Sequence, residues 1–382
     1  MGRGDGGGLD SRLRGNDGEN VLQFLRMSIV LPASVAFLAA WGLAPLVRRL
    51  AFAVGAVDRP DGARKIHRRP TAELGGLVIL AAVVAGVAIA FWLGGLPGAH
   101  IREKHLVGLV VGLVVLALGG AVDDRFDLRP WQQFTLVVLA ALVVIAAGIG
   151  ITFVTSPLGG QLRLDGWQFI LFWFRGIPYK VTVIADLFTL AWLLVMTHTT
   201  KLADGLDGLV SGLAVIGAGI ITAVSFMKDV AQPDTAVLAL VVAGAFAGFL
   251  IHNFNPASIF LGQGGSTMAG FLLGALAIVS GGKIATALLV LGLPLFDAAL
   301  VVVRRVIAGR SPFAADRSHL HHRLLDAGLT QRQAVLFYWF TAALFGVSTL
   351  MLDGLEKLVA IGLLASVVIA GTAGYVAWRR RA

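Results

Sequence analysis

Long apolar runs, separated by short polar loops, follow one another along most of the chain. Each run is close to the roughly 20 residues that an α-helix needs to cross the hydrocarbon core of a bilayer. None alternates over about ten residues, which would be typical of a membrane barrel strand. The pattern predicts an all-α, polytopic membrane protein with about eleven transmembrane helices, at residues 27–47, 75–97, 106–122, 134–154, 181–200, 209–227, 235–252, 265–281, 284–303, 334–352 and 357–377.

The first 20 residues differ from the rest of the chain. They are polar and rich in glycine, a composition that predicts a disordered tail at 1–20. We expect residues 21–382 to form a single membrane domain. The first apolar run has no small-residue cleavage site and is followed by further runs, so we expect an anchor and not a removed signal peptide.

Composition supports the membrane assignment and excludes several functions. The chain is 57% hydrophobic and 14% charged, whereas a soluble domain has about 25% charged residues. The formal net charge is +9, but the basic residues lie in short loops and not along one solvated face, so we expect no nucleic-acid partner. Because the chain has no cysteine, disulfides and thiolate metal sites are excluded.

The distribution of basic residues predicts the topology. Of the 31 Lys and Arg residues, 19 lie in the loops after odd-numbered spans or at the C-terminal end. The positive-inside rule places these loops in the cytoplasm and the N-terminus outside. The polar clusters described below all fall in the cytoplasmic set.

Two acidic clusters interrupt the apolar pattern. The stretch 198–209, HTTKLADGLDGL, places Asp204 and Asp207 three residues apart among glycines, and GGAVDDRFDLRP places Asp123, Asp124 and Asp127 at the end of the third run. Charged side chains at a bilayer are costly without a cation, a partner or water. The alternatives are a solvated helix end or a site for a hard cation, and the two clusters together favour Mg²⁺. Adjacent helical residues point about 100° apart, so we expect separate tasks for the first two acids.

Two cytoplasmic loops are rich in cations. The first spans 57–76 and either anchors the chain on anionic headgroups or clamps a phosphorylated substrate, and both can hold together. Its cations are Arg59, Arg64, Lys65, His67, Arg68 and Arg69. The second spans 304–333. Its three closely spaced histidines suggest zinc, but the ligand spacing of a structural zinc site is missing. We therefore favour a phosphate or diphosphate pocket, formed by His319, His321 and His322 with Arg305, Arg310, Arg317 and Arg323.

Two further segments carry weaker signals. The segment 251–270 contains Asn253, Asn255 and Pro256, followed by a glycine-rich stretch that opens the next run. Such a stretch either aims backbone N–H groups at a phosphate or allows close helix packing. The aromatic loop at about 155–180 fits an interfacial belt or hairpin, and we assign it no chemistry.

Five motifs in this order resemble the polyprenyl-phosphate N-acetylhexosamine-1-phosphate transferases, glycosyltransferase family 4. They are VDRPDGARKIHRRP with Gly75 and Gly76, VDDRFD, DGLDGL, FNPASIFLGQGGS and HLHHRLL. The likeness covers about 57–328, and the HLHH form resembles the undecaprenyl-phosphate GlcNAc-1-phosphate transferase-like branch.

The resemblance implies a reaction and a place in the cell. A HexNAc-1-phosphate, with GlcNAc-1-phosphate favoured, would pass from a UDP-sugar to undecaprenyl or another polyprenyl phosphate, with release of UMP. This would be the first membrane step of a cell-envelope polysaccharide pathway, such as that of lipopolysaccharide O-antigen. The enzyme would be a multi-pass protein of a bacterial inner membrane with a cytoplasmic active site. Its partners would be both substrates and the bilayer, with a homodimer as one form of assembly.

The resemblance also implies roles for individual residues. Its cofactor would be Mg²⁺, with Mn²⁺ as an alternative, held by Asp124, Asp204, Asp207 and Gln263. The catalytic acids would be Asp123, Asp124, Asp204 and Asp207, one of the first pair deprotonating or positioning the lipid phosphate. Phe260 would lie near the uracil and the histidines near the diphosphate. The implied substrate-binding residues are Lys65, His67, Lys201, Asn255, Phe260, Arg305, His319, His321 and His322.

Four residues depart from the family pattern. Gln263 stands where the family usually has a metal-binding Asp, and Gln133 stands where it has a basic residue. His198 and Lys201 stand where it has asparagines. Either Lys201 supplies part of the missing charge balance, or the chain is a divergent, non-catalytic lipid-phosphate or nucleotide-sugar binding relative. A membrane transporter is a third alternative, but the acids gather on one face and do not cross the midplane.

Overall fold

The computed structural model describes residues 8–60, 69–98, 101–156, 160–174, 177–227, 230–281, 284–309, 319–352 and 354–379. It confirms an all-α, polytopic membrane protein. The helices are α1 (Gly8–Val54), α2 (Gly75–Trp92), α3 (Glu103–Phe126), α4 (Pro130–Ala146), α5 (Val183–Ala203), α6 (Leu209–Ser225), α7 (Pro233–Asn253), α8 (Gly262–Val279), α9 (Ile284–Val290), α10 (Gly292–Ile307), α11 (Leu320–Asp326), α12 (Gln331–Ser348) and α13 (Gly354–Arg379).

Every predicted run contains a helix, although α2 and α4 end before the runs 75–97 and 134–154 do, and fewer helices have the length and hydropathy of a complete span. Among the described residues, seven helices meet both conditions, or up to eight if α9 and α10, bent by 79° at their break, form one span. The prediction of about eleven transmembrane helices is therefore higher than the number of helices that meet both conditions. The other predicted runs fail for identifiable reasons. The helices α4 and α6 have 17 residues each, and α12 opens with the polar residues Gln331, Arg332 and Gln333.

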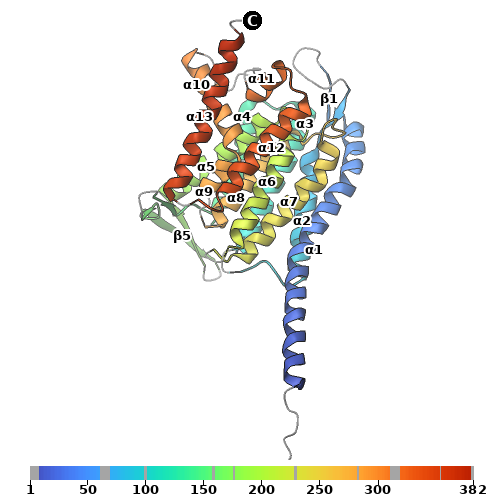
Figure 1. Cartoon of the computed structure of the whole chain (residues 1–382), viewed down its shortest axis with the longest axis vertical. Helices are drawn as coiled ribbons and strands as arrows, with labels where there is room; N and C mark the ends of the chain where they lie inside the picture. The colour runs from blue at the N-terminus through green and yellow to red at the C-terminus, as the bar shows by residue number, and fades with distance from the viewer. Residues whose placement is uncertain are drawn as a thin grey trace, which may run out of the picture.

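The first helix begins earlier than its apolar run. It starts at Gly8, inside the polar segment 1–20 for which composition predicts disorder. The division of the chain into a tail and one membrane domain stays a prediction. Figure 1 shows the N-terminal part of α1 extending beyond the other helices, while its C-terminal part packs against α2 and α7.

The helix α8 lies in the middle of the bundle. It is almost entirely buried, and it packs against α2, α3, α5 and α6. Its first turn is built for close approach: a Cβ on Gly120 of α3 would collide with the backbone of Gly264, and a Cβ on Gly76 of α2 would lie 2.7 Å from the Gly265 nitrogen. Of the two alternatives for this glycine-rich stretch, close packing through small residues is therefore realised.

Three short antiparallel hairpins complete the described structure. They pair β1 (Val57–Asp58) with β2 (Thr71–Ala72), β3 (Phe153–Thr155) with β4 (Gln161–Arg163), and β5 (Gln168–Phe174) with β6 (Ile177–Thr182). The aromatic loop thus contains a hairpin, as one of its two interpretations predicted. Figure 1 shows β5 near one end of the bundle and α11 and β1 near the other.

Candidate active site

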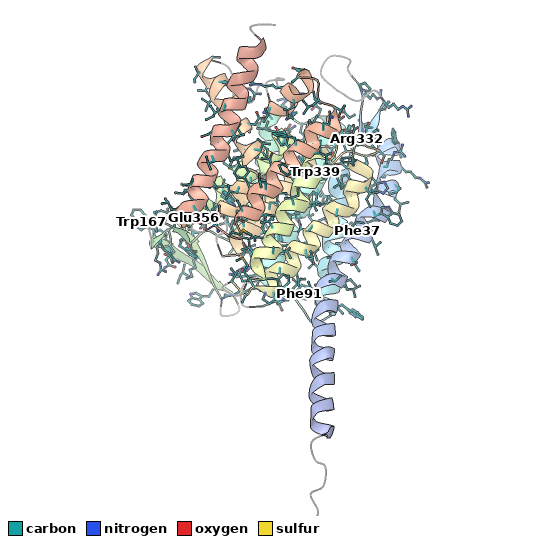
Figure 2. The ribbon with its side chains drawn as sticks, in the orientation of Figure 1. Phe37, Phe91, Trp167, Arg332, Trp339 and Glu356 are labelled. Carbon is teal, nitrogen blue, oxygen red and sulfur yellow. The ribbon has the colours of Figure 1, made fainter. Side chains whose placement is uncertain are left out.

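A cavity of about 710 Å³ lies among the ends of α3 and α5, the start of α8, α11 and the start of α12. Its side chains come from segments far apart in the sequence. Figure 2 locates the cavity at the α11 end of the bundle, because it labels Arg332, the neighbour of the lining residue Gln331, there. Trp167, beside the β5–β6 hairpin, is labelled near the opposite end. The polar side chains of the wall are Asp58, Arg59, Glu73, Asp123, Asp124, Arg125, Asp127, Lys201, Asp204, Asp207, Asn253, Gln263, Ser266, His322 and Gln331.

Most of the predicted site residues meet at this cavity. Those that line it are Asp123, Asp124, Lys201, Asp204, Asp207, Phe260, Gln263 and His322. Asn255 and His321 stand directly behind lining residues, as described below, whereas Arg305 and His319 are buried outside the lining. Lys65 and His67 lie outside the described residues, so their predicted roles stay predictions.

Asp124 ties α3 to the start of α8. Its Oδ1 atom accepts a hydrogen bond of 2.7 Å from the Gln263 N–H, and its Oδ2 atom accepts one of 3.3 Å from the Leu74 N–H. The carboxylate lies so close to Gly262 that a Cβ there would collide with it. Gly262 also has a φ of 65° and begins the helix, so glycine is required on two grounds. One of the free N–H groups at the start of α8 thus donates its hydrogen bond to a carboxylate of α3.

Asp204 follows the last residue of α5 and is half-buried in the cavity wall. Withdrawal from bulk water, followed by repulsion from the Asp124 and Asp207 carboxylates, raises the pKa of Asp204 to about 7; the Ser266 hydroxyl opposes this rise. Three carboxylates therefore interact in one cavity. Such a cluster favours a proton or a cation between its members.

Asp207 is held in place by the segment before α8. Its Oδ2 atom accepts hydrogen bonds of 3.0 Å from Asn255 Nδ2 and 3.0 Å from the Ala257 N–H. Asn255 Nδ2 also donates to Gln331 Oε1 at 2.6 Å. The predicted residue Asn255 therefore connects Asp207 to α12 and supports the wall from behind.

The histidine cluster is packed against the DGLDG loop. The ring centroids of His319 and His321 are 5.5 Å apart and nearly parallel, and those of His321 and His322 are 4.3 Å apart. A Cβ on Gly205 would lie 2.5 Å from His321 Nε2. Burial, with the neighbouring His322 and His319 rings as further causes, lowers the pKa of His321 well below its usual value. Neutral His321 therefore supports the loop, and His322 is the member that reaches the cavity.

A buried carboxylate outside the cavity anchors this cluster. Asp297 of α10 bonds to His319 Nδ1 at 3.0 Å through Oδ2, and its Oδ1 accepts a bond of 2.8 Å from the Leu320 N–H. Asp297 is only 4% exposed. His319 thus acts as the connection between α10 and the start of α11.

The oxygen-rich wall suits a hard cation. Within the described ranges, no three His, Asp or Glu side chains are grouped closely enough to form a metal site by themselves. Mg²⁺ does not need such a group, since it is held by one or two carboxylates, water and substrate phosphates. The interacting acids Asp124, Asp204 and Asp207, with the amide of Gln263, offer only oxygen donors at the cavity. These residues fit Mg²⁺, and the predicted ligand set stays a prediction.

Sequence reasoning did not assign a role to Gln331 or Gln133. Gln331 opens α12 and lines the cavity, where its Oε1 accepts a hydrogen bond from Asn255, 76 positions earlier in the chain. Its only local signal is the capping box that Thr330 and Gln333 form around it. Gln133 lies on α4 and bonds to both Asp123 and Lys201. Its one signal in the sequence is the departure from the family pattern.

Comparisons with known proteins agree with the five motifs. The family model described as glycosyl transferase family 4 matches residues 106–281. The chain is 31% identical over 330 residues to a probable undecaprenyl-phosphate N-acetylglucosaminyl 1-phosphate transferase of Bacillus subtilis (strain 168), covering 85% of each chain. It is 33% identical over 363 residues to decaprenyl-phosphate N-acetylglucosaminephosphotransferase of Mycobacterium tuberculosis (strain H37Rv), covering 88% of this chain and 85% of that one.

A third relative is more distant but similar over most of its length. It is undecaprenyl-phosphate alpha-N-acetylglucosaminyl 1-phosphate transferase of Escherichia coli (strain K12), 29% identical over 307 residues, which cover 78% of this chain and 76% of that one. Motifs, cavity and relatives lead to one conclusion: this chain belongs to glycosyl transferase family 4.

Proposed function

We propose that the protein transfers an N-acetylhexosamine 1-phosphate, with GlcNAc-1-phosphate favoured, from a UDP-sugar to a polyprenyl phosphate. One observation carries this proposal: residues of the VDDRFD, DGLDGL, GQGGS and HLHH motifs line a single cavity. The names of the relatives above give transfer of an N-acetylglucosamine phosphate, with undecaprenyl or decaprenyl phosphate as the lipid. The product would be the first lipid-linked intermediate of a cell-envelope polysaccharide.

The reaction joins one phosphate to another. An oxygen of the polyprenyl phosphate attacks the phosphorus that carries the sugar, a new P–O–P bond forms, and the bond to UMP breaks. UMP leaves with the electron pair of that bond. Such transfers depend on positioning and charge neutralisation more than on covalent work by the protein. Mg²⁺, when bound by the acids of the wall and by substrate phosphate, supplies part of that neutralisation.

The side chains of the wall divide the remaining work. Lys201 and Arg125 offer cationic groups to the phosphates, and His322 offers a further nitrogen donor. Asp123, which also lines the cavity, positions or deprotonates the lipid phosphate. Phe260 supplies an aromatic surface on which the uracil stacks.

The cavity would face the cytoplasm of a bacterium, at the inner membrane. The segments 48–74 and 304–333 contain 13 of the 31 Lys and Arg residues. They include β1 and α11, which lie at this end of the bundle (Figure 1). The positive-inside rule favours their retention in the cytoplasm. A second copy of the chain would complete a homodimer, which sedimentation in detergent would test.

A radiochemical membrane assay tests the proposal. Membranes that contain the wild type would receive labelled UDP-GlcNAc and undecaprenyl phosphate, with and without Mg²⁺. We expect a labelled lipid that depends on Mg²⁺ and is lost in Asp204→Asn. Absence of lipid product with UDP-GlcNAc and with a panel of other UDP-sugars would contradict the transferase.

A second candidate function is that of a non-catalytic relative that binds a lipid phosphate or a nucleotide sugar. Gln263 favours it, because this side chain offers the cavity a neutral amide where family members usually have a charged ligand. Lipid product from Gln263→Asp but not from the wild type would support that alternative. The same membranes, reconstituted into sealed vesicles, would reveal a transporter by uptake of the nucleotide sugar without lipid product.

A further inference from the structure

One amide side chain connects a carboxylate and a cation on the same wall of the cavity. Gln133 Nε2 donates to Asp123 Oδ1 at 2.8 Å and to the Leu128 carbonyl at 3.0 Å, while Gln133 Oε1 accepts from Lys201 Nζ at 2.5 Å. Asp123 belongs to α3, Gln133 to α4 and Lys201 to α5. The three helices therefore meet through this amide.

The chemistry of the partners leaves the amide one orientation. A lysine ammonium only donates, so it must meet the oxygen of Gln133; the Asp123 carboxylate and the Leu128 carbonyl accept, so they must meet the nitrogen. Rotation by 180° would break all three bonds. Gln133 is thus locked by groups on both sides, and each group is in turn placed by Gln133.

Asp123 and Lys201 each keep hydrogen-bonding groups that a substrate can use. Asp123 Oδ1 accepts from Gln133 and from the Leu128 N–H at 2.8 Å. Within the described ranges, Asp123 Oδ2 accepts no hydrogen bond, and Lys201 Nζ donates only to Gln133. An ammonium has three N–H donors, so two of them are left. Both side chains line the cavity.

We propose that Gln133 is a positioning residue that holds Asp123 Oδ2 and Lys201 Nζ together as a donor and acceptor pair for the phosphate of the polyprenyl acceptor. The inference rests on the proposed function. A phosphate monoester has a second pKa of about 6, so it can present both an ionised oxygen and a P–OH group near neutral pH. Lys201 binds the ionised oxygen and Asp123 accepts from the P–OH. The diphosphate of a UDP-sugar, esterified at both ends, lacks such a hydroxyl and matches the pair less well.

Two single substitutions test the connection. Gln133→Glu keeps an oxygen for Lys201 but places a second oxygen, without a proton to donate, against Asp123. Lys201→Gln removes the cation. For each variant we expect kcat/KM for polyprenyl phosphate to fall about tenfold or more, as expected for loss of a hydrogen bond to a charged group. The change should appear in the KM for polyprenyl phosphate, while the KM for UDP-GlcNAc stays within about twofold.

The reciprocal exchange, Gln133→Lys with Lys201→Gln, separates positioning from simple support of the fold. In this variant the new lysine can donate to Asp123 and to the new amide oxygen, so charge and connection are both restored. We expect it to regain about tenfold in kcat/KM over Lys201→Gln. The matched control is Gln132→Glu, because in the described part of the chain Gln132 bonds through its Oε1 alone, as acceptor from the Arg129 N–H, and does not line the cavity. It should keep wild-type constants and a monodisperse elution profile in detergent.

A binding experiment distinguishes failure of this inference from failure of the proposed function. Polyprenyl phosphate would be titrated onto the purified chain in nanodiscs, without Mg²⁺ and without nucleotide sugar. A loss of affinity in both single variants, recovered in the exchange, supports the inference even if no transfer is detected. Unchanged affinity in the single variants, no recovery in the exchange, or equal changes in the KM of both substrates would overturn it.

Discussion

Asp124 and Gln263 are joined through the backbone: the Asp124 Oδ1 atom accepts a hydrogen bond of 2.7 Å from the Gln263 N–H. The Gln263 side chain takes no part in this bond, and it lines the cavity beside the acids. Substitution of the side chain therefore changes the ligands offered to a cation without releasing Asp124 from the start of α8.

This separation makes Gln263→Asp an informative variant. A carboxylate in place of the amide adds one negative charge to the oxygen donors, and more ligand charge strengthens cation binding. We expect the Mg²⁺ concentration for half-maximal activity to fall about tenfold, equivalent to about 1.4 kcal/mol. A Mg²⁺ titration of the membrane assay would measure it.

Gln263→Asn is the matched control, because asparagine has the length of aspartate and the neutral amide of the wild type. It should keep a Mg²⁺ requirement similar to that of the wild type or weaker. Equal Mg²⁺ requirements for the Asp and Asn variants would show that this side chain does not contribute to the cation site.

The raised pKa of Asp204 predicts how Mg²⁺ binding depends on pH. Without a cation, burial and the neighbouring carboxylates raise the pKa of Asp204 to about 7, so below that pH the cation has to displace a proton. We expect the half-saturating Mg²⁺ concentration to rise up to about tenfold per unit as pH falls below about 7 and to level off above it. Asp204→Asn should weaken this dependence and remove most of the activity.

The raised pKa of Asp204 also predicts how the stability of the metal-free protein depends on pH: stability should fall as pH rises, whereas Mg²⁺ binding should strengthen. The folded state binds the Asp204 proton more tightly than the unfolded chain, whose carboxyl has a pKa near 3.8. The free energy of unfolding of the metal-free protein should therefore fall as pH rises from about 4 to about 7. Thermal unfolding of wild type and Asp204→Asn in EDTA would measure this difference. A slope in Asp204→Asn as steep as that of the wild type would contradict the contribution of Asp204.

Gly205 tests whether the histidine cluster supports the DGLDG loop. In Gly205→Ala the new methyl group would lie 2.5 Å from His321 Nε2, so the ring or the loop has to move. Overpacking of this kind costs about 1–3 kcal/mol. We expect a lower unfolding temperature and a loss of activity, because the loop carries Asp204 and Asp207.

Gly219→Ala is the matched control. It makes the same change in the interior of α6, where a Cβ would meet nothing within 4 Å. Alanine is favoured over glycine inside a helix, so this variant should be as stable as the wild type or more stable. A Gly205→Ala variant that behaves like Gly219→Ala would contradict the packing role of His321.

Sequence patterns predicted the elements because the bilayer imposes a length on each apolar run. They also placed Asp204 and Asp207 at a helix junction, since two acids among glycines are a strong local signal. The positions of Gln331 and Gln133 had no such signal. Gln331 reaches the cavity because α12 packs on α6, where Trp339 Nε1 donates to the Leu209 carbonyl. Contacts of this range depend on how the helices pack, which no local pattern describes.

The three histidines also show what a sequence motif does not predict. The family resemblance implies that all three lie near the diphosphate, yet of the three only His322 lines the cavity. His319 bonds to Asp297, which lies 22 residues earlier on a helix whose apolar pattern gives no sign of the contact. A motif identifies which residues are important in a family without separating those that face a substrate from those that hold them.

Asp297 provides the last prediction. Asp297→Ala removes the acceptor of both His319 Nδ1 and the Leu320 N–H in a buried site, and each lost bond to a charged group costs about 1.5–3 kcal/mol. We expect a clearly lower unfolding temperature and lower activity, because α11 loses its connection to α10 and His322 its fixed position. Asp297→Asn keeps an oxygen for the Leu320 N–H and should lose less. If both variants unfold at the wild-type temperature, the Asp297 contact does not anchor α11; if they are destabilised but fully active, His322 does not depend on that anchor.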